Sequence, residues 1–284
     1  HTKLEVSFDW DKRYLNGKAL LQLKPHFYPQ DVLELDAKGF DIHNVNLVEG
    51  DSETKAGYDY NGSILTIDLG KKINRSELVS VKIDYTAKPY ELESKGSAAI
   101  TEDRGLYFIN HDGSEEGKPK QIWTQGETEA SSCWFPTIDA PNQRSTQEIY
   151  ITVEENFTTL SNGDLVYSQI NGDGTKTDYW KMEKPHAPYL FMMAIGEYAV
   201  VEDEWNGMPV NYYVEPEYEQ YAKDIFGNTP KMLTYFTELL DYPYPWSKYS
   251  QVVVRDYVSG AMENTTASVF MEDLHMTRRE LLDD

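Results

Sequence analysis

The sequence predicts a mostly β protein, in which an antiparallel β-sandwich or curved, saddle-like sheet is followed by the beginning of a mixed α/β unit. Three observations support this. Apolar and polar residues alternate in short runs up to about residue 201, turn pairs such as Asn-Gly punctuate these runs, and a helical period appears only after about residue 204. We therefore predict an N-terminal antiparallel β-domain over residues 1–203 and a second, incomplete domain over residues 204–284.

The N-terminal strands are predicted from one-sided alternation of apolar residues. Asn16-Gly17 is expected to close a hairpin, and Asn162-Gly163 and Asn171–Gly174 are expected to form two further tight turns. The strands themselves are marked by the apolar sets Leu4, Val6, Phe8 and Trp10; Ala19, Leu21 and Leu23; Leu65, Ile67 and Leu69; Val79, Val81, Ile83 and Tyr85; and Ile149, Ile151 and Val153.

The second unit is predicted to mix strands with helices. Asn206-Gly207 turns the chain into a strand over 210–214, and one short helix is expected over 217–226. Thr229-Pro230 is typical of a helix start, with Thr229 as the N-cap. The helix that follows has one apolar face, formed by Met232, Leu233, Phe236, Leu239 and Leu240.

Composition narrows the class of protein. The chain has 284 residues, of which 40% are hydrophobic, and this supports a folded protein with a sizeable core. A net charge of −22 argues against nucleic acid as a partner, and no apolar run is long enough to cross a membrane. The single cysteine, Cys133, lies beside Trp134 and Phe135, which favours a buried thiol.

The segment 258–264, Val-Ser-Gly-Ala-Met-Glu-Asn, places a glycine and a carboxylate between two strand-like runs, 251–254 and 267–270. Strands normally avoid Gly, Glu and Asn. A glycine within a strand pattern indicates that another backbone comes close, and a peptide that adds itself to a sheet edge is one candidate. We therefore expect a peptide-binding edge strand with one charged anchor, Glu263.

Gly260, Ala261, Met262, Glu263 and Asn264 resemble the Gly-x-Met-Glu-Asn exopeptidase motif of the aminopeptidase N family of zinc metallopeptidases. The resemblance implies a thermolysin-like catalytic domain beginning after the β-domain. It also implies that the motif's backbone pairs with a peptide substrate and that Glu263 binds the substrate's free α-amino group. Met262 is expected to pack in the core, and Asn264 to tie the strand to its neighbours.

A second match lies upstream. Gln125 and Glu127, followed by the Phe-Pro-x-x-Asp-x-Pro segment 135–141, are similar to the family's loop that completes the amine site. The Ala-Arg pair usual in this segment is replaced by Ser131 and Ser132, but the proposed amine ligands are unchanged. The resemblance therefore implies that Glu127 and Glu263, from two domains, bind one ammonium group.

The zinc site of the family is missing from this sequence. No His-Glu-x-x-His motif occurs, and no two of the six histidines are spaced i, i+4. We expect the zinc ligands and the general base to lie beyond Asp284, with a helical segment over 277–284 leading toward them. This chain alone is therefore predicted to contain no catalytic residues, to bind no zinc and to be inactive.

Two function classes follow. The first is a zinc aminopeptidase that acts on peptides with a free N-terminus, with this chain supplying the amine anchor. The alternative is a non-catalytic β-sandwich module that recognises protein or peptide N-termini. A third hypothesis is a relative of leukotriene hydrolase with epoxide chemistry. The Thr265-Thr266 pair after the motif resembles the Thr-Thr pair of related bacterial proteins that are often exported. This resemblance implies a location in the periplasm or cell envelope, with the cytoplasm as the alternative. The sequence does not determine oligomeric state.

Overall fold

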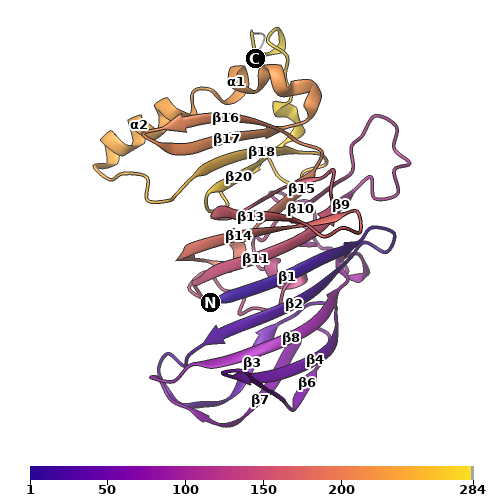
Figure 1. Ribbon diagram of the computed structural model, residues 1–284, viewed down its shortest axis with the longest axis vertical. Helices are drawn as coiled ribbons and strands as arrows, with labels where there is room; N and C mark the ends of the chain where they lie inside the picture. The colour runs from indigo at the N-terminus through magenta and orange to yellow at the C-terminus, as the bar shows by residue number, and fades with distance from the viewer. Residues whose placement is uncertain (283–284) are drawn as a thin grey trace.

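The computed structural model describes residues 1–282, which form an elongated molecule made mostly of strands (Figure 1). The strands of these residues form four sheets. Strands from residues 30–87 lie at one end of the long axis, the N-terminus lies near its middle, and both α-helices lie at the other end, with the C-terminal unit (Figure 1). The predicted mostly β fold, followed by a mixed α/β unit, is confirmed.

The largest sheet has eight strands in the order β13-β14-β11-β1-β2-β8-β4-β5. All its neighbouring pairs are antiparallel except β1 and β11, which run parallel. Its strands are β1 (Thr2–Asp9), β2 (Tyr14–Leu23), β4 (Phe40–Glu49), β5 (Ser52–Lys55), β8 (Val79–Ala87), β11 (Ser145–Glu154), β13 (Asp164–Ile170) and β14 (Thr175–His186).

Two smaller sheets complete the N-terminal part. One has the order β3-β7-β6 and the other β12-β15-β10-β9. Their strands are β3 (Gln30–Asp36), β6 (Tyr58–Tyr60), β7 (Ile64–Ile73), β9 (Leu106–Ile109), β10 (Gln121–Thr124), β12 (Thr158–Ser161) and β15 (Met193–Gly196). Every residue of β9, β10 and β15 is buried, so this four-stranded sheet lies inside the protein.

The predicted hairpin of the first two strands is present, but its turn is not at Asn16-Gly17. The chain turns between β1 and β2, at residues 10–13, and Gly17 lies within β2 opposite Tyr85 of β8. A Cβ on Gly17 would lie 2.3 Å from the Tyr85 ring, which itself stacks on Phe40. The glycine is therefore required by the close approach of an aromatic ring and not by a turn. The predicted turns at 162–163 and 171–174 are confirmed.

The C-terminal unit is built on a five-stranded sheet in the order β16-β17-β18-β20-β19. Its strands are β16 (Ala199–Trp205), β17 (Met208–Val214), β18 (Tyr249–Val254), β19 (Ala261–Met262) and β20 (Ala267–Met271). β17, β18 and β20 run parallel, and β18 is buried along almost its whole length. This sheet starts at Ala199; the predicted domain division after residue 203 stays a prediction.

Helical segments connect these strands. The helix expected over 217–226 is a 3-10 helix (Pro216–Tyr221) followed by α1 (Ala222–Phe226). α2 runs over Thr229–Leu240, but Thr229 is its first residue and not its cap, because the Thr229 hydroxyl bonds Gln251 Oε1 at 2.6 Å. The segment expected to be helical over 277–284 contains a 3-10 turn at Glu280–Leu282, and its last two residues lie outside the described part.

The apolar face of α2 lies largely in solvent. Met232, Phe236, Leu239 and Leu240 are between 53% and 67% exposed, whereas Leu233 packs against the core of the C-terminal unit. No helix within residues 1–282 has the length and apolar character that crossing a membrane requires. The apolar residues of α2 therefore lie on one face, as the sequence predicts. Such a face is usually buried, but most of its side chains are exposed here.

His186 makes the folded state sensitive to acid. Burial lowers the pKa of His186 from 6.5 to about 3, because the ring stacks on Phe191 and contacts Gln147 away from water. Between these two pH values the unfolded chain binds a proton that the folded chain does not, so lowering the pH through this window favours unfolding.

We predict that His186→Gln makes the free energy of unfolding less dependent on pH. Between pH 6 and 4 the slope should fall by up to about 1.4 kcal/mol per pH unit, the value for one proton. Urea unfolding at several pH values measures it, with His26→Gln, an exposed ring, as the control. Equal slopes in the wild type and His186→Gln would contradict the prediction.

Candidate functional site

Segment 258–264 contributes the edge strand of the C-terminal sheet. β19 pairs only with β20 among residues 1–282, through Ala261 opposite Phe270 and Met262 opposite Val269. The predicted edge strand is therefore confirmed, although regular pairing covers only two residues. Met262 is 2% exposed and packs in the core as expected, whereas Ala261 and Glu263 face solvent.

Gly260 leaves open space beside this edge. Its carbonyl accepts a hydrogen bond from Met271 N at 3.1 Å, but a Cβ built on it would meet no atom within 4 Å. Its conformation is not one reserved for glycine, since its φ lies outside the left-handed region. Nothing within the described chain thus requires a glycine here, and the space is free for another backbone.

Gln125 and Glu127 lie on the loop that follows β10. Gln125 is 1% exposed; its N donates to Gly105 O at 3.0 Å, and its Oε1 accepts a bond from Glu127 N at 3.3 Å. Its Nε2 is buried with no partner among the described residues. Glu127 itself is exposed. The loop thus holds a buried amide behind an exposed carboxylate.

Tyr257 relates the two carboxylates to each other. Its pKa is raised, first by burial and then by repulsion from Tyr107, Glu263 and Glu127. Its hydroxyl is buried without a hydrogen-bond partner in the part of the chain that is described. The Tyr257 ring packs on Trp123 of β10, with 5.0 Å between the ring centres, so the strand that leads to Gln125 contacts the segment that leads to Gly260. The sequence analysis missed Tyr257; its only signal was an aromatic residue three positions before Gly260.

Asn264 corrects an expectation. It is 2% exposed, yet neither its Oδ1 nor its Nδ2 has a partner within residues 1–282. Only its backbone ties the segment, through a bond from Ala267 N to Asn264 O at 3.1 Å. The side chain lines a cavity of about 510 Å³ together with Glu263, Thr265 and the rings of Tyr244 and Trp246. An unpaired buried amide therefore lies beside the exposed carboxylate.

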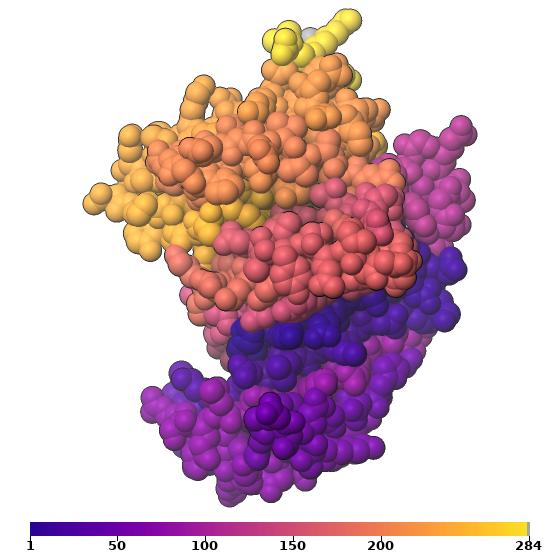
Figure 2. All heavy atoms as spheres, in the orientation of Figure 1, coloured from indigo at the N-terminus to yellow at the C-terminus, as the bar shows by residue number. Residues whose placement is uncertain are grey.

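The N-terminal part holds both ends of this segment by hydrogen bonds. At the first end, Thr101 N donates to Val258 O at 3.0 Å, and Trp123 Nε1 donates to Arg255 O at 3.0 Å. At the second end, Asn162 Nδ2 donates to Thr265 O at 2.7 Å. The edge strand is thus fixed against the sheets that carry Gln125 and Glu127. Figure 2 shows the orange and yellow atoms of the C-terminal unit resting on the pink and red strands below them.

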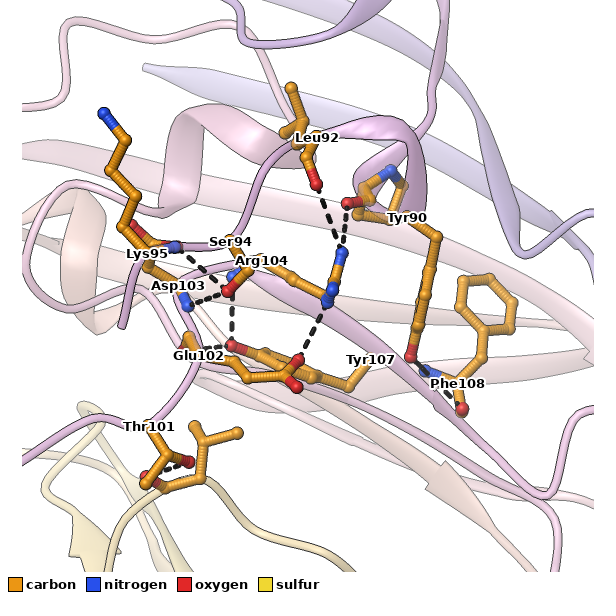
Figure 3. Close-up of polar contacts among 12 residues, drawn as sticks. Tyr90, Leu92, Ser94, Lys95, Thr101, Glu102, Asp103, Arg104, Tyr107 and Phe108 are labelled. Atoms are coloured by element: carbon orange, nitrogen blue, oxygen red, sulfur yellow. Dashed lines mark hydrogen bonds and ion pairs between the residues drawn. The ribbon is translucent and has the colours of Figure 1, made fainter. Parts of the chain in front are cut away.

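The loop that carries Thr101 is itself rigidly tied (Figure 3). Arg104 Nε donates to Glu102 Oε2 at 2.8 Å, and its Nη1 donates to the carbonyls of Pro89 and Leu92 at 3.4 and 3.3 Å. Tyr107 closes the loop by donating to Glu102 O at 2.6 Å. The same loop contacts both parts of the candidate site. Thr101 bonds Val258, before the edge strand, and Gly105 O accepts the bond from Gln125 N.

The described residues do not form a metal site. Among residues 1–282 there is no group of three or more His, Cys, Asp or Glu side chains that could hold an ion. His275, one of the buried histidines, stacks on Tyr218, and burial lowers its pKa to about 4. Cys133 is buried, and burial raises its pKa to about 12, which fits an inert thiol. A resident zinc does not fit this donor set.

Two family descriptions match the chain. Residues 1–190 match the Peptidase M1 N-terminal domain, and residues 225–281 match the Peptidase family M1 domain. The mitochondrial aminopeptidase 2 of Saccharomyces cerevisiae is 28% identical over 266 residues, which cover 93% of this chain and 27% of that protein. The chain spans about a quarter of the length of such relatives.

Two further matches show how far the fold extends. The structure of native yeast LTA4 hydrolase superimposes with a TM-score of 0.76 and 21% identity, covering 100% of this chain and 42% of that one. At this identity the likeness concerns the fold. Transcription initiation factor TFIID subunit 2 of Gallus gallus is 22% identical over 210 residues, which cover 73% of this chain and 17% of that protein.

We predict that Gly260→Ala leaves stability nearly unchanged, within about 0.5 kcal/mol, because its Cβ would enter open space. Gly163→Ala is the matched contrast: its φ is +73°, and a Cβ would lie 1.9 Å from Lys181 O, so it should be strongly destabilised. Chemical unfolding of the two variants measures this. A large loss in Gly260→Ala would mean that residues of this chain need the glycine.

Proposed function

Because the chain belongs to the M1 peptidase family, with the N-terminal-domain match over residues 1–190, we propose that it supplies the substrate-amine and backbone-pairing part of an aminopeptidase. The observation that carries this proposal is that one loop holds both segments: Thr101 N donates to Val258 O, and Gly105 O accepts a bond from Gln125 N, each at 3.0 Å. The activity itself is proposed for the longer protein, since relatives named as aminopeptidases are about three and a half times as long as this chain.

An aminopeptidase must distinguish a free N-terminus from an internal peptide bond. The difference is a small cation, since an α-amino group has a pKa near 8, and adjacent carboxylates favour its charged form. At about 4 Å and an effective dielectric constant of about 20, each ion contact is worth up to about 4 kcal/mol before desolvation. Both carboxylates are exposed in this chain, so solvent screening reduces that value until a substrate covers them.

The buried amides suit the remaining donors and acceptors of a peptide end. Gln125 Nε2 and both side-chain polar atoms of Asn264 are unpaired within residues 1–282, next to the two carboxylates. The edge strand β19 offers backbone groups to an extended peptide, and Gly260 leaves room for its approach. In this proposal Gln125, Glu127 and Glu263 bind the amine end, while Gly260 and Ala261 align the first peptide bond.

The hydrolytic step belongs, in this proposal, to residues outside this chain. A zinc ion, if bound by residues elsewhere in the whole protein, would supply an activated water for hydrolysis. In this proposal the present chain contributes binding and orientation of the peptide's amine end.

A non-catalytic binding module is the second candidate. It is favoured by a relative named as a transcription initiation factor subunit. The sequence that follows Asp284 in the whole protein separates the two: a His-Glu-x-x-His motif supports the peptidase, and an unrelated domain supports the module. The likeness to a solved LTA4 hydrolase concerns the fold and does not add support for epoxide chemistry.

In the whole protein, Glu263→Gln and Glu127→Gln should each lower kcat/KM for aminoacyl anilides about 30-fold or more. Removing one partner of a desolvated ion contact commonly costs at least about 2 kcal/mol. Bound zinc should be unchanged in both. Glu129→Gln, an exposed carboxylate two residues from Glu127, is the control and should keep wild-type kinetics. Wild-type rates in both test variants would remove the assigned roles.

Blocking the substrate's amine gives an independent test. N-acetylation removes the positive charge, so the whole protein should cleave acetylated peptides at least about 100-fold more slowly than free ones, because two ion contacts are lost together. Paired peptides that differ only in the acetyl group, followed by chromatography, measure this. Equal cleavage of both peptides would show that no amine anchor operates.

A further inference from the structure

Lys248 lies at the junction of the two halves of the molecule. It precedes β18, is 6% exposed, and its Nζ donates to Ser161 O at 2.9 Å. The same Nζ lies 3.4 Å from both Thr266 O and Thr266 Oγ1. One ammonium group therefore joins the end of β12, in the N-terminal part, to the residue that directly follows Asn264-Thr265.

Thr266 needs such support. Its φ is +69°, in the left-handed region that β-branched residues rarely adopt. Gly163 N donates to its Oγ1 at 2.8 Å, and Ser250 N donates to its carbonyl at 2.8 Å. Together with Lys248, these contacts stabilise the turn at Thr266. Because Glu263 lies only three residues before this turn, its position depends on them.

The surroundings of Lys248 separate it from an ordinary surface lysine. Its Nζ lies 5.2 Å from the centre of the buried Trp180 ring. The charge of Asp164, on β13, favours the protonated form of Lys248 and so opposes the effect of burial. Burial lowers its pKa to about 7, and strongly perturbed groups of this kind are more common at functional sites than elsewhere.

We propose that Lys248 is a positioning residue for amine recognition. Its hydrogen bonds to Ser161 and Thr266 fix the position of Glu263 and Asn264 relative to the β-domain. In that position, Glu127 of the β-domain and Glu263 can bind the same amino group. The proposal rests on the proposed function for its effect on substrate, but the geometric part stands by itself. Lys248 touches no substrate in this arrangement; it acts through the turn at Thr266, which lines the same cavity as Glu263.

The chain offers a closely matched control. Lys184 also donates to a carbonyl across this junction, to Pro245 O, and also lies over an indole ring, that of Trp246, at 5.9 Å. It is exposed, however, and its hydrogen bond goes to Pro245 and not to the segment 260–266. Lys184→Met therefore removes a similar interaction from the same junction without affecting the turn.

The experiment compares Lys248→Met with Lys184→Met in the whole protein. Lys248→Met should raise KM for an aminoacyl anilide at least tenfold while kcat changes less than threefold, because the amine anchor is displaced in both the bound and the transition state. Lys184→Met should leave both constants unchanged. Thr266→Val, which replaces the hydroxyl with a methyl group, should also raise KM. This variant tests the proposal if Lys248→Met does not fold.

Hydrogen exchange provides a readout that does not depend on activity. The amides of Gly163, Ala267 and Met271 bond Thr266 Oγ1, Asn264 O and Gly260 O, respectively. In Lys248→Met they should exchange at least tenfold faster, while amides of β2 and β8 keep their wild-type rates. Unchanged exchange at these three amides overturns the geometric claim.

The two proposals can fail separately. If exchange rises but KM stays at the wild-type value while Glu263→Gln raises it, Lys248 is a structural residue only and the positioning role is overturned. If Glu263→Gln itself has wild-type kinetics, the amine anchor is wrong, and the exchange data alone then decide whether Lys248 holds the turn.

Discussion

The candidate site depends on hydrogen bonds that fix both ends of segment 255–266 to the β-domain. Thr101 and Trp123 bond one end, through Val258 O and Arg255 O, and Asn162 bonds the other, through Thr265 O. Each of these bonds satisfies a backbone carbonyl that would otherwise be buried at the junction without a partner. Because both ends are held, a two-residue edge strand can keep a defined position without the long ladder that usually fixes a strand.

Several buried polar atoms near these segments have no partner within the described chain. They are Gln125 Nε2, two residues before Glu127, the Tyr257 hydroxyl, and both side-chain polar atoms of Asn264, which follows Glu263. Buried polar groups in folded proteins are normally paired, so these atoms are available to a bound molecule. The exposed apolar face of α2 borders the same cavity, through Met232 and Phe236.

Much of the fold could be predicted because it follows from periodicity. Alternation in β8 and β11 placed their apolar residues on one buried face, and the helical period of α2 was read correctly. The position of the first turn was predicted wrongly, and the reason is physical. Gly17 was read as a turn residue because Asn-Gly favours turns, but a ring from a distant strand fills the space its missing Cβ leaves. A local pattern carries no information about which distant side chain comes close.

The sequence by itself determined that the chain is mostly β, that its last sheet has an edge at Gly260–Asn264, and which carboxylates are candidates for an amine site, since these are properties of short contiguous segments. Only the tertiary structure decided that Tyr257 packs on Trp123, that the Asn264 side chain has no partner among the described residues, and that Lys248 bridges Ser161 and Thr266. Those facts depend on contacts between residues up to about 130 positions apart, and only packing brings such residues within hydrogen-bond or Coulomb range.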